Sequence, residues 1–121
     1  MRGSTKAVLC LAVALAVSDA QPLQAHTHLL RATPADGSSI AVSPPRLQLE
    51  FSEAATVTGL SIQRTGDAAP LKLTRLRQRP SAGFVIDLPL LAPGNYLVKW
   101  RALSDDSHVA SGSIRFTLQA R

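Results

Sequence analysis

Apolar and polar residues alternate with a period of two along most of the chain after residue 46. Leu47, Leu49 and Phe51, for example, are separated by Gln48 and Glu50. Alternation of this kind gives a strand one apolar face. The other rows are Leu60/Ile62, Leu71/Leu73 (with Leu76 as a candidate extension), Phe84/Ile86/Leu88, Tyr96/Val98/Trp100/Ala102 and Ile114/Phe116/Leu118. With a first strand at residues 28–33, the pattern predicts an all-β, immunoglobulin-like antiparallel sandwich of about seven short strands.

Individual residues refine this prediction. Trp100 lies mid-strand and is the expected filler of the core centre. Tyr96 follows Pro93-Gly94, the position of a tyrosine-corner residue whose hydroxyl bonds to nearby backbone. Arg75, Arg77 and Arg79 alternate, which would place them on one face of a strand. A solvated sheet face or an edge protected by charge is the favoured interpretation, and a surface for an anionic partner or a membrane is the alternative.

The N-terminal segment has a different character. Arg2 and Lys6 precede an uninterrupted apolar run at residues 7–17, and a polar stretch then ends at Ala25. This order is typical of a secretory signal peptide, and the run is shorter than the roughly 20 residues that span a bilayer. A buried core helix is the disfavoured alternative, since no face of the run is polar. We expect residues 1–25 to be removed, although cleavage after Ala20 fits the small-residue rule better.

Removal of residues 1–25 would leave residues 26–121, enough for one domain. Met1 and Cys10 are the only methionine and cysteine, so this part has no disulfide and no sulfur ligand for Cu(I). It carries 11 of the 13 basic and 7 of the 8 acidic residues, a net charge of +4. Because no aromatic residues lie among the arginines, we expect no nucleic-acid partner.

The three histidines are the main candidates for chemistry. They are His26, His28 and His108, and Asp105 and Asp106 lie close to the last. Cleavage after Ala25 would give His26 a free α-amine, which chelates a metal together with the imidazole. Asp106 and His108 are two residues apart, so in an extended segment their side chains project to the same side. An amine, two imidazoles and a carboxylate favour tetragonal Cu(II).

These features coincide with a family resemblance. The start HTHLLRATPADGS, the segment LQLEFSE at residues 47–53, the stretch PGNYLVKWRALS at residues 93–104, Asp106-Ser107-His108 and GSIRF at residues 112–116 resemble the copper-resistance protein CopC family. The resemblance covers nearly all of residues 26–118. It implies a Greek-key, cupredoxin-like β-barrel or sandwich that carries Cu(II) in the periplasm. The implied ligands are the amine and imidazole of His26 together with Asp106 and His108.

The chain also departs from that family. Founding members carry a methionine-rich Cu(I) site, whereas residues 59–83 contain no methionine. We therefore expect one Cu(II) per mature chain and no Cu(I) site. Val109 replaces the usual proline after the histidine, and Asp105 adds a second carboxylate near the proposed ligand. A chain that begins at His26 also fits the amino-terminal copper motif through His28. The backbone of Thr27 and His28 should instead form the hydrogen bonds of the first strand. We therefore expect His28 to be an alternate or outer ligand.

The leading hypothesis is a periplasmic protein that buffers or delivers Cu(II) and is not an enzyme. The resemblance implies transfer to an inner-membrane CopD-type partner, and we expect a monomer. One alternative is an oxygenase with a histidine brace, which is disfavoured because Asp106 would occupy an open coordination position. The other is a metal-free immunoglobulin-like module for adhesion.

Overall fold

The computed structural model describes residues 3, 14 and 27–120. Apart from Gly3 and Ala14, the predicted signal segment lies outside the described residues, and so does His26. Among the residues described, no helix is long and apolar enough to cross a membrane.

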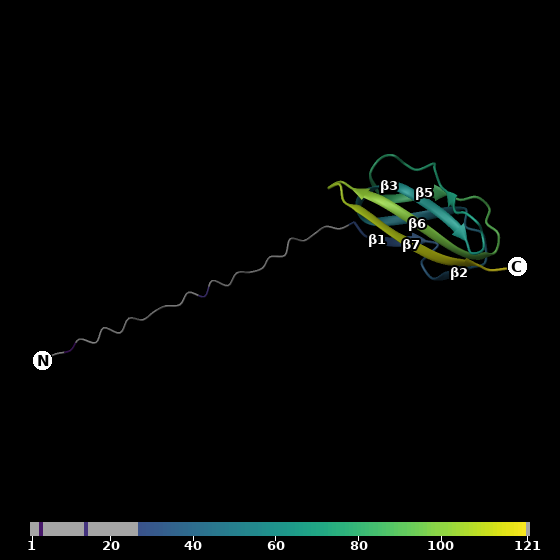
Figure 1. The fold of residues 1–121 in the computed structure, drawn as a ribbon, viewed down its shortest axis with the longest axis horizontal. Coiled ribbons are helices and arrows are strands. Elements are labelled where there is room, and N and C mark those ends of the chain that lie inside the picture. Colours follow the sequence, from purple (N-terminus) through teal and green to yellow (C-terminus); the bar gives the residue numbers. More distant parts are fainter. Residues whose placement is uncertain (1–2, 4–13, 15–26, 121) are drawn as a thin grey trace.

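The described part of the chain folds into seven strands (Figure 1). Neighbouring strands run antiparallel, except that β2 runs parallel to β7. The strands are β1 (Leu29–Thr33), β2 (Ser38–Ile40), β3 (Arg46–Arg64), β4 (Leu71–Lys72), β5 (Ser81–Asp87), β6 (Gly94–Ser104) and β7 (Val109–Leu118). The all-β prediction is therefore confirmed.

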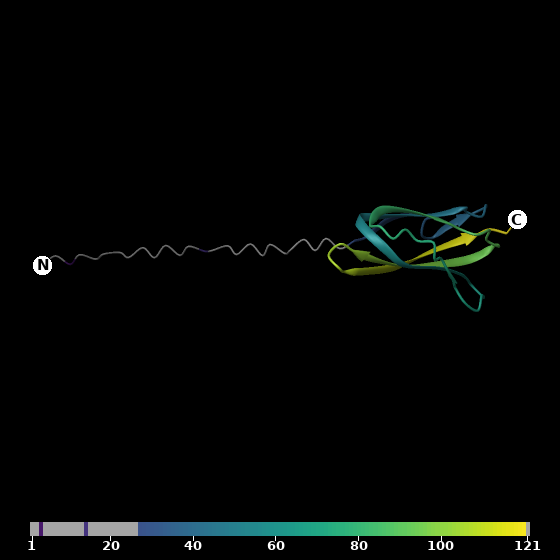
Figure 2. The same cartoon turned by 90° about the horizontal axis from the view of Figure 1, so that it is seen from above.

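The curled sheet forms two layers, and strand β3 belongs to both of them. Its first part pairs with β1 on one side and β5 on the other, through residues 46–51. Its second part pairs with β4 and β6, and β6 continues through β7 to β2. Figures 1 and 2 show the strands curled around a single interior. A strand shared between layers holds them together without a connecting loop.

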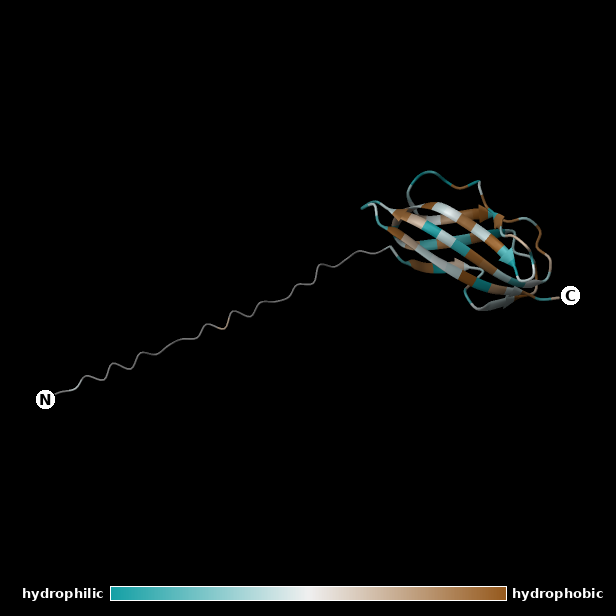
Figure 3. Ribbon diagram, viewed as in Figure 1, coloured by the Kyte–Doolittle hydropathy of each residue, from teal (hydrophilic) through white to brown (hydrophobic). Residues whose placement is uncertain are grey.

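The apolar row of β3 changes its phase once. Val57 pairs with Ala102 and Gly59 pairs with Arg101, so Thr58 is an extra residue, a β-bulge. After the bulge, even-numbered residues face the interior, beginning with Leu60 opposite Trp100. Figure 3 shows the resulting alternation of hydrophobic and hydrophilic residues along the strands.

The centre of the core is aromatic. Phe51 makes edge-to-face contacts with Phe84, at 5.9 Å between ring centroids, and with Trp100, at 5.3 Å. Phe51 and Phe84 come from one layer and Trp100 from the other, so the Phe51–Trp100 contact joins the layers. The buried apolar residues are Leu47, Leu49, Phe51, Ala55, Val57, Leu60, Ile62, Phe84, Ile86, Tyr96, Val98, Trp100, Ala102, Ile114, Phe116 and Leu118. The core position predicted for Trp100 is thus confirmed.

Tyr96 also occupies its predicted role. Its hydroxyl donates to the carbonyl oxygen of Ala92, and its ring stacks on Phe116 at 5.2 Å. Burial raises its pKa, which keeps the hydroxyl protonated as a donor. Tyr96 therefore fixes the loop before β6, as a tyrosine corner does.

Several strand predictions need correction. The rows predicted at residues 47–51 and 60–62 belong to the single strand β3, which is continuous because β5 pairs with its first part and β6 with its second. The short strand β2 was not predicted, and β1 begins at Leu29 rather than at residue 28. Only Leu71 and Lys72 form β4, so the prediction of Arg75, Arg77 and Arg79 on one strand face is wrong. These arginines lie exposed in an irregular segment, whose leucines Leu73 and Leu76 pack against the core instead.

The close contact between Gly112 and Trp100 predicts that a larger residue at position 112 destabilises the fold. Trp100 lies over Gly112 of β7, and a Cβ added at Gly112 would lie 2.6 Å from Cζ2 of Trp100. We expect Gly112→Ala to lower the free energy of unfolding by about 1–3 kcal/mol through overpacking. Gly83→Ala is the matched control, since a Cβ there meets nothing within 4 Å. Urea unfolding measures both, and equal stabilities of the two variants would contradict the packing described.

Candidate metal centre

The turn between β6 and β7 is tightly organised. The Ser104 amide donates to the carbonyl of His108 at 2.9 Å, and the Ser107 amide donates to the carbonyl of Ser104 at 3.0 Å. Ser107 has a φ of 68°, a left-handed conformation that is uncommon outside glycine. This reversal turns the chain back, so that the side chains on either side of Ser107 meet.

Asp106 and His108 form a direct side-chain pair in this turn. Oδ2 of Asp106 lies 2.8 Å from Nδ1 of His108. The other carboxylate oxygen, Oδ1, accepts hydrogen bonds from the Ser104 hydroxyl and from the His108 amide, the latter at 3.3 Å. A carboxylate offers about four lone-pair positions, and three of those of Asp106 are used within the turn. Both side chains are mostly exposed, so solvent and ions reach them.

The same hydrogen bonds set the ionisation of Asp106. The Ser104 hydroxyl, followed by the side chain and then the backbone amide of His108, lowers the pKa of the Asp106 carboxyl well below its usual range. Asp106 therefore carries its negative charge throughout the neutral and mildly acidic range. A permanent carboxylate against an imidazole nitrogen is suited to orient the ring and to attract a cation.

The start of the domain is anchored to β3. His28 and Ser52 exchange two hydrogen bonds: the Ser52 amide donates to the carbonyl of His28 at 2.8 Å, and the His28 amide donates to the Ser52 hydroxyl at 2.9 Å. The His28 side chain is exposed. Thr27 is buried, and its hydroxyl finds no hydrogen-bond partner among the described residues. The hydrogen bonds between β1 and β3 thus continue to His28, one residue before β1 begins.

Strand β3 brings this start close to the β6–β7 turn. Ser52 holds His28, and Ala55, three residues later, pairs with Ser104. Three residues span at most about 11 Å, even when fully extended. Figures 1 and 2 both show the start of β1 and the β6–β7 turn at the same end of the domain.

The structure therefore brings together part of the predicted site. Asp106 and His108 contact each other, but their segment is a turn and not the expected extended segment. His28 lies at the same end, and His26 lies outside the described residues. In the described part of the chain, no three side chains of His, Cys, Asp or Glu form a cluster that could hold a metal ion.

Sequence reasoning missed the contribution of Ser104. This serine is 8% exposed, and it anchors both the backbone of the turn and the Asp106 carboxylate. The available signal was a polar residue at an inward-facing position of the row that contains Trp100 and Ala102. A buried hydroxyl at such a position needs a partner, and here the partner is Asp106.

A family model for the CopC domain matches residues 29–119. The chain belongs to the CopC domain family. The matched region includes Asp106 and His108, whereas His26 and His28 precede it.

Curated relatives agree with this assignment. Copper resistance protein C of Pseudomonas syringae pv. tomato is 30% identical, over 79% of this chain and 82% of the relative. Copper resistance protein C of Escherichia coli is 31% identical, over 78% of this chain and 82% of the relative.

Solved structures show the same fold. CopC from Methylosinus trichosporium OB3b matches with a TM-score of 0.66 and 28% identity, covering 78% of this chain and 94% of that one. PcoC of Escherichia coli, described as a methionine-rich copper resistance protein, matches with a TM-score of 0.60 and 30% identity. That match covers 78% of this chain and the whole of the other. The predicted sandwich or barrel and the resemblance to the family are confirmed.

The hydrogen bonds of the turn predict a measurable shift of the Asp106 pKa. Because the Ser104 hydroxyl is the largest cause of the low value, Ser104→Ala should raise the Asp106 pKa toward the usual range of aspartates. Carbon-13 NMR of the carboxyl carbon during an acid titration measures it. Ser111→Ala, at an exposed position of β7 outside the turn, should leave it unchanged. An equally low pKa in Ser104→Ala would contradict the assignment.

The low pKa also fixes the direction of the pH effect on stability. A carboxyl whose pKa is lower in the folded state stabilises the fold above its unfolded pKa. That stabilisation is lost as the pH falls through the folded pKa. Ser104→Ala should therefore move the loss of the Asp106 contribution to a higher pH.

Proposed function

We propose that this protein binds one Cu(II) ion and buffers or delivers copper in the periplasm as part of copper resistance. Membership of the CopC domain family supports a role in copper resistance, because the relatives described above are copper resistance proteins. The paired carboxylate and imidazole of Asp106 and His108 supply donors that Cu(II) accepts.

The main support for the proposal is that Ser52 and Ala55 of β3, three positions apart, connect the start of the domain to the β6–β7 turn. His26 precedes Thr27 directly in the sequence, and consecutive Cα atoms lie about 3.8 Å apart. On this ground we propose that His26 contributes to a site at that end of the domain. After cleavage at Ala25, the amine and imidazole of His26, together with His108 and Asp106, form a set of three nitrogens and one oxygen.

The donor types select the oxidation state. Residues 26–121 contain neither cysteine nor methionine, so the soft sulfur ligands that suit Cu(I) are absent from this segment. The Escherichia coli structure is described as methionine-rich, which this chain is not. Cu(II), which prefers nitrogen and oxygen donors in a tetragonal arrangement, fits the residues present.

His28 is the weaker candidate for a ligand. The amino-terminal copper motif needs the deprotonated amide of the third residue, which in the mature chain would be His28. That amide donates to the Ser52 hydroxyl at 2.9 Å, so this mode of binding would break an anchor of β1. We therefore propose His26, Asp106 and His108 as ligands and His28 as an alternate or outer residue.

The exposed site suits a carrier. Both side chains of the Asp106–His108 pair are accessible, which permits ligand exchange with a partner protein. We propose residues 1–25 as the signal peptide, a monomeric mature protein and an inner-membrane CopD-type acceptor. We propose no catalytic activity, because Asp106 would fill a position that an oxygenase keeps open.

Copper titration of the mature protein tests the ligand set. The wild type should bind one Cu(II), and a His26→Ala/His108→Ala variant should lose at least tenfold in affinity because two imidazoles are removed. His28→Ala is the matched control and should change the affinity less than threefold. Equal affinity of the wild type and the double variant would refute the proposal.

The intact mass of the exported, copper-loaded protein checks the underlying assumption. The expected mass is that of residues 26–121 with one copper ion. A mass that includes residues 21–25 would show cleavage after Ala20, which removes the amine of His26 from the ligand set.

A further inference from the structure

The hydrogen-bonded ladder on one side of β3 has a gap. On this side, Ala55 pairs with Ser81 of β5, and Ser61 and Ile62 pair with β4. The Leu73 amide also donates to the carbonyl of Leu60 at 2.9 Å. Between these points, no strand in the described part of the chain pairs with residues 56–59 on this side. An unpaired stretch of strand is a template for another extended segment.

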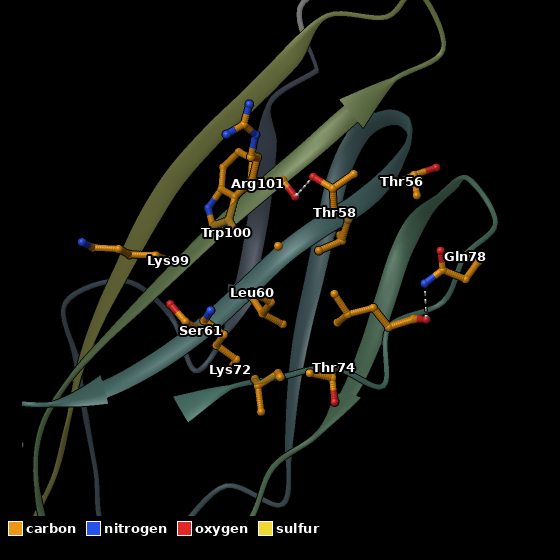
Figure 4. A pocket seen from close by; sticks show the side chains of 14 residues that line it. Thr56, Thr58, Leu60, Ser61, Lys72, Thr74, Gln78, Lys99, Trp100 and Arg101 are labelled. Carbon is orange, nitrogen blue, oxygen red and sulfur yellow. Dashed lines mark hydrogen bonds between the residues drawn. The ribbon is translucent and has the colours of Figure 1, made fainter. Parts of the chain in front are cut away.

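A groove of about 700 Å³ lies along this gap (Figure 4). Thr56, Thr58 and Leu60 of β3 form one side, and Thr74 and Gln78 of the segment between β4 and β5 form the other. Apolar lining comes from Leu73, Leu76 and Trp100. The groove therefore offers strand backbone, hydroxyl groups and an apolar surface together.

The charged groups at this groove are all positive. Lys72, Lys99 and Arg101 line it, and no carboxylate does. Arg75, Arg77 and Arg79 lie exposed along the same irregular segment. Within the described residues, none of these six cations forms an ion pair. A concentration of unpaired positive charge attracts a negatively charged partner.

We propose that this groove binds an extended, acidic segment of a partner protein, which adds a strand beside residues 56–59 of β3. Strand addition uses main-chain hydrogen bonds for affinity and alternate side chains for specificity. In such a segment, acidic side chains would face the cations and the intervening apolar side chains would face Leu73, Leu76 and Trp100. A lipid headgroup would satisfy the positive charges but would leave the strand edge unused. This site shares no residue with the proposed copper site.

A synthetic peptide tests the proposal on the mature protein. The probe is a capped octapeptide in which Glu and Val alternate, with a Lys/Val peptide of the same length as the charge control. We expect the acidic peptide to bind with saturation and to shift the indole NMR signal of Trp100, the only tryptophan. Binding of both peptides with similar affinity, or of neither, would overturn the proposal.

Protein variants and a third peptide locate the binding. Lys72→Glu/Arg101→Glu reverses two exposed charges and should weaken binding of the acidic peptide at least tenfold. Arg115→Glu, an exposed residue of β7 that does not line the groove, should change it less than twofold. An acidic peptide with proline at its two central Val positions keeps its charge but loses backbone donors, and should bind at least tenfold more weakly.

Three further results would contradict the proposal. Undiminished binding of the proline-containing peptide would exclude strand addition. Unchanged binding to Lys72→Glu/Arg101→Glu would place the peptide elsewhere. Binding of the protein to vesicles rich in phosphatidylglycerol, without binding of the acidic peptide, would assign the groove to a lipid surface instead.

Discussion

The short stretch of β3 from Ser52 to Ala55 is the constraint on which the proposed site depends. Here β3 leaves the pairing with β1 and enters the pairing with β6. Ser52 holds the chain at His28, and Ala55 holds Ser104 at the start of the β6–β7 turn. The aromatic core supports this arrangement, since Phe51, immediately before Ser52, contacts Trp100 of β6 across the two layers. Folding of the sandwich therefore brings the start of β1 and the Asp106–His108 pair to the same end of the domain (Figures 1 and 2).

The β6–β7 turn supplies two of the proposed ligands, Asp106 and His108, already oriented by the fold. Ser104 is buried and fixes the Asp106 carboxylate, which in turn contacts the imidazole of His108. Orienting these groups before a metal arrives reduces the entropic cost of binding. The proposed other half of the site depends on His26, whose free amine would exist only after the proposed cleavage at Ala25. In the proposed site, the fold would fix the turn and the end of the chain would add the amine, so that one exposed site could hold copper and still exchange it.

The sequence alone predicted the all-β class, the inward rows and the roles of Trp100 and Tyr96, because period-two alternation and turn residues are local signals. Pairing between distant strands could not be predicted in this way. The continuity of β3 depends on its partners β5 and β6, and the formation of β2 depends on its parallel pairing with β7. The irregular segment after β4 follows from the packing of Leu73 and Leu76 rather than from alternation. At the site, spacing predicted that Asp106 and His108 are neighbours. The turn that joins them requires the positive φ of Ser107 and the buried Ser104 hydroxyl, which no periodicity reveals.

Electron spin-echo envelope modulation of the Cu(II)-loaded mature protein would identify the ligands at the proposed site, because it detects the remote nitrogens of coordinated imidazoles. We expect modulation from two imidazoles in the wild type, and from one after His108→Ala. We also expect that His28→Ala leaves the spectrum unchanged. A wild-type spectrum that His108→Ala does not alter would contradict the claim that the β6–β7 turn supplies half of the copper site.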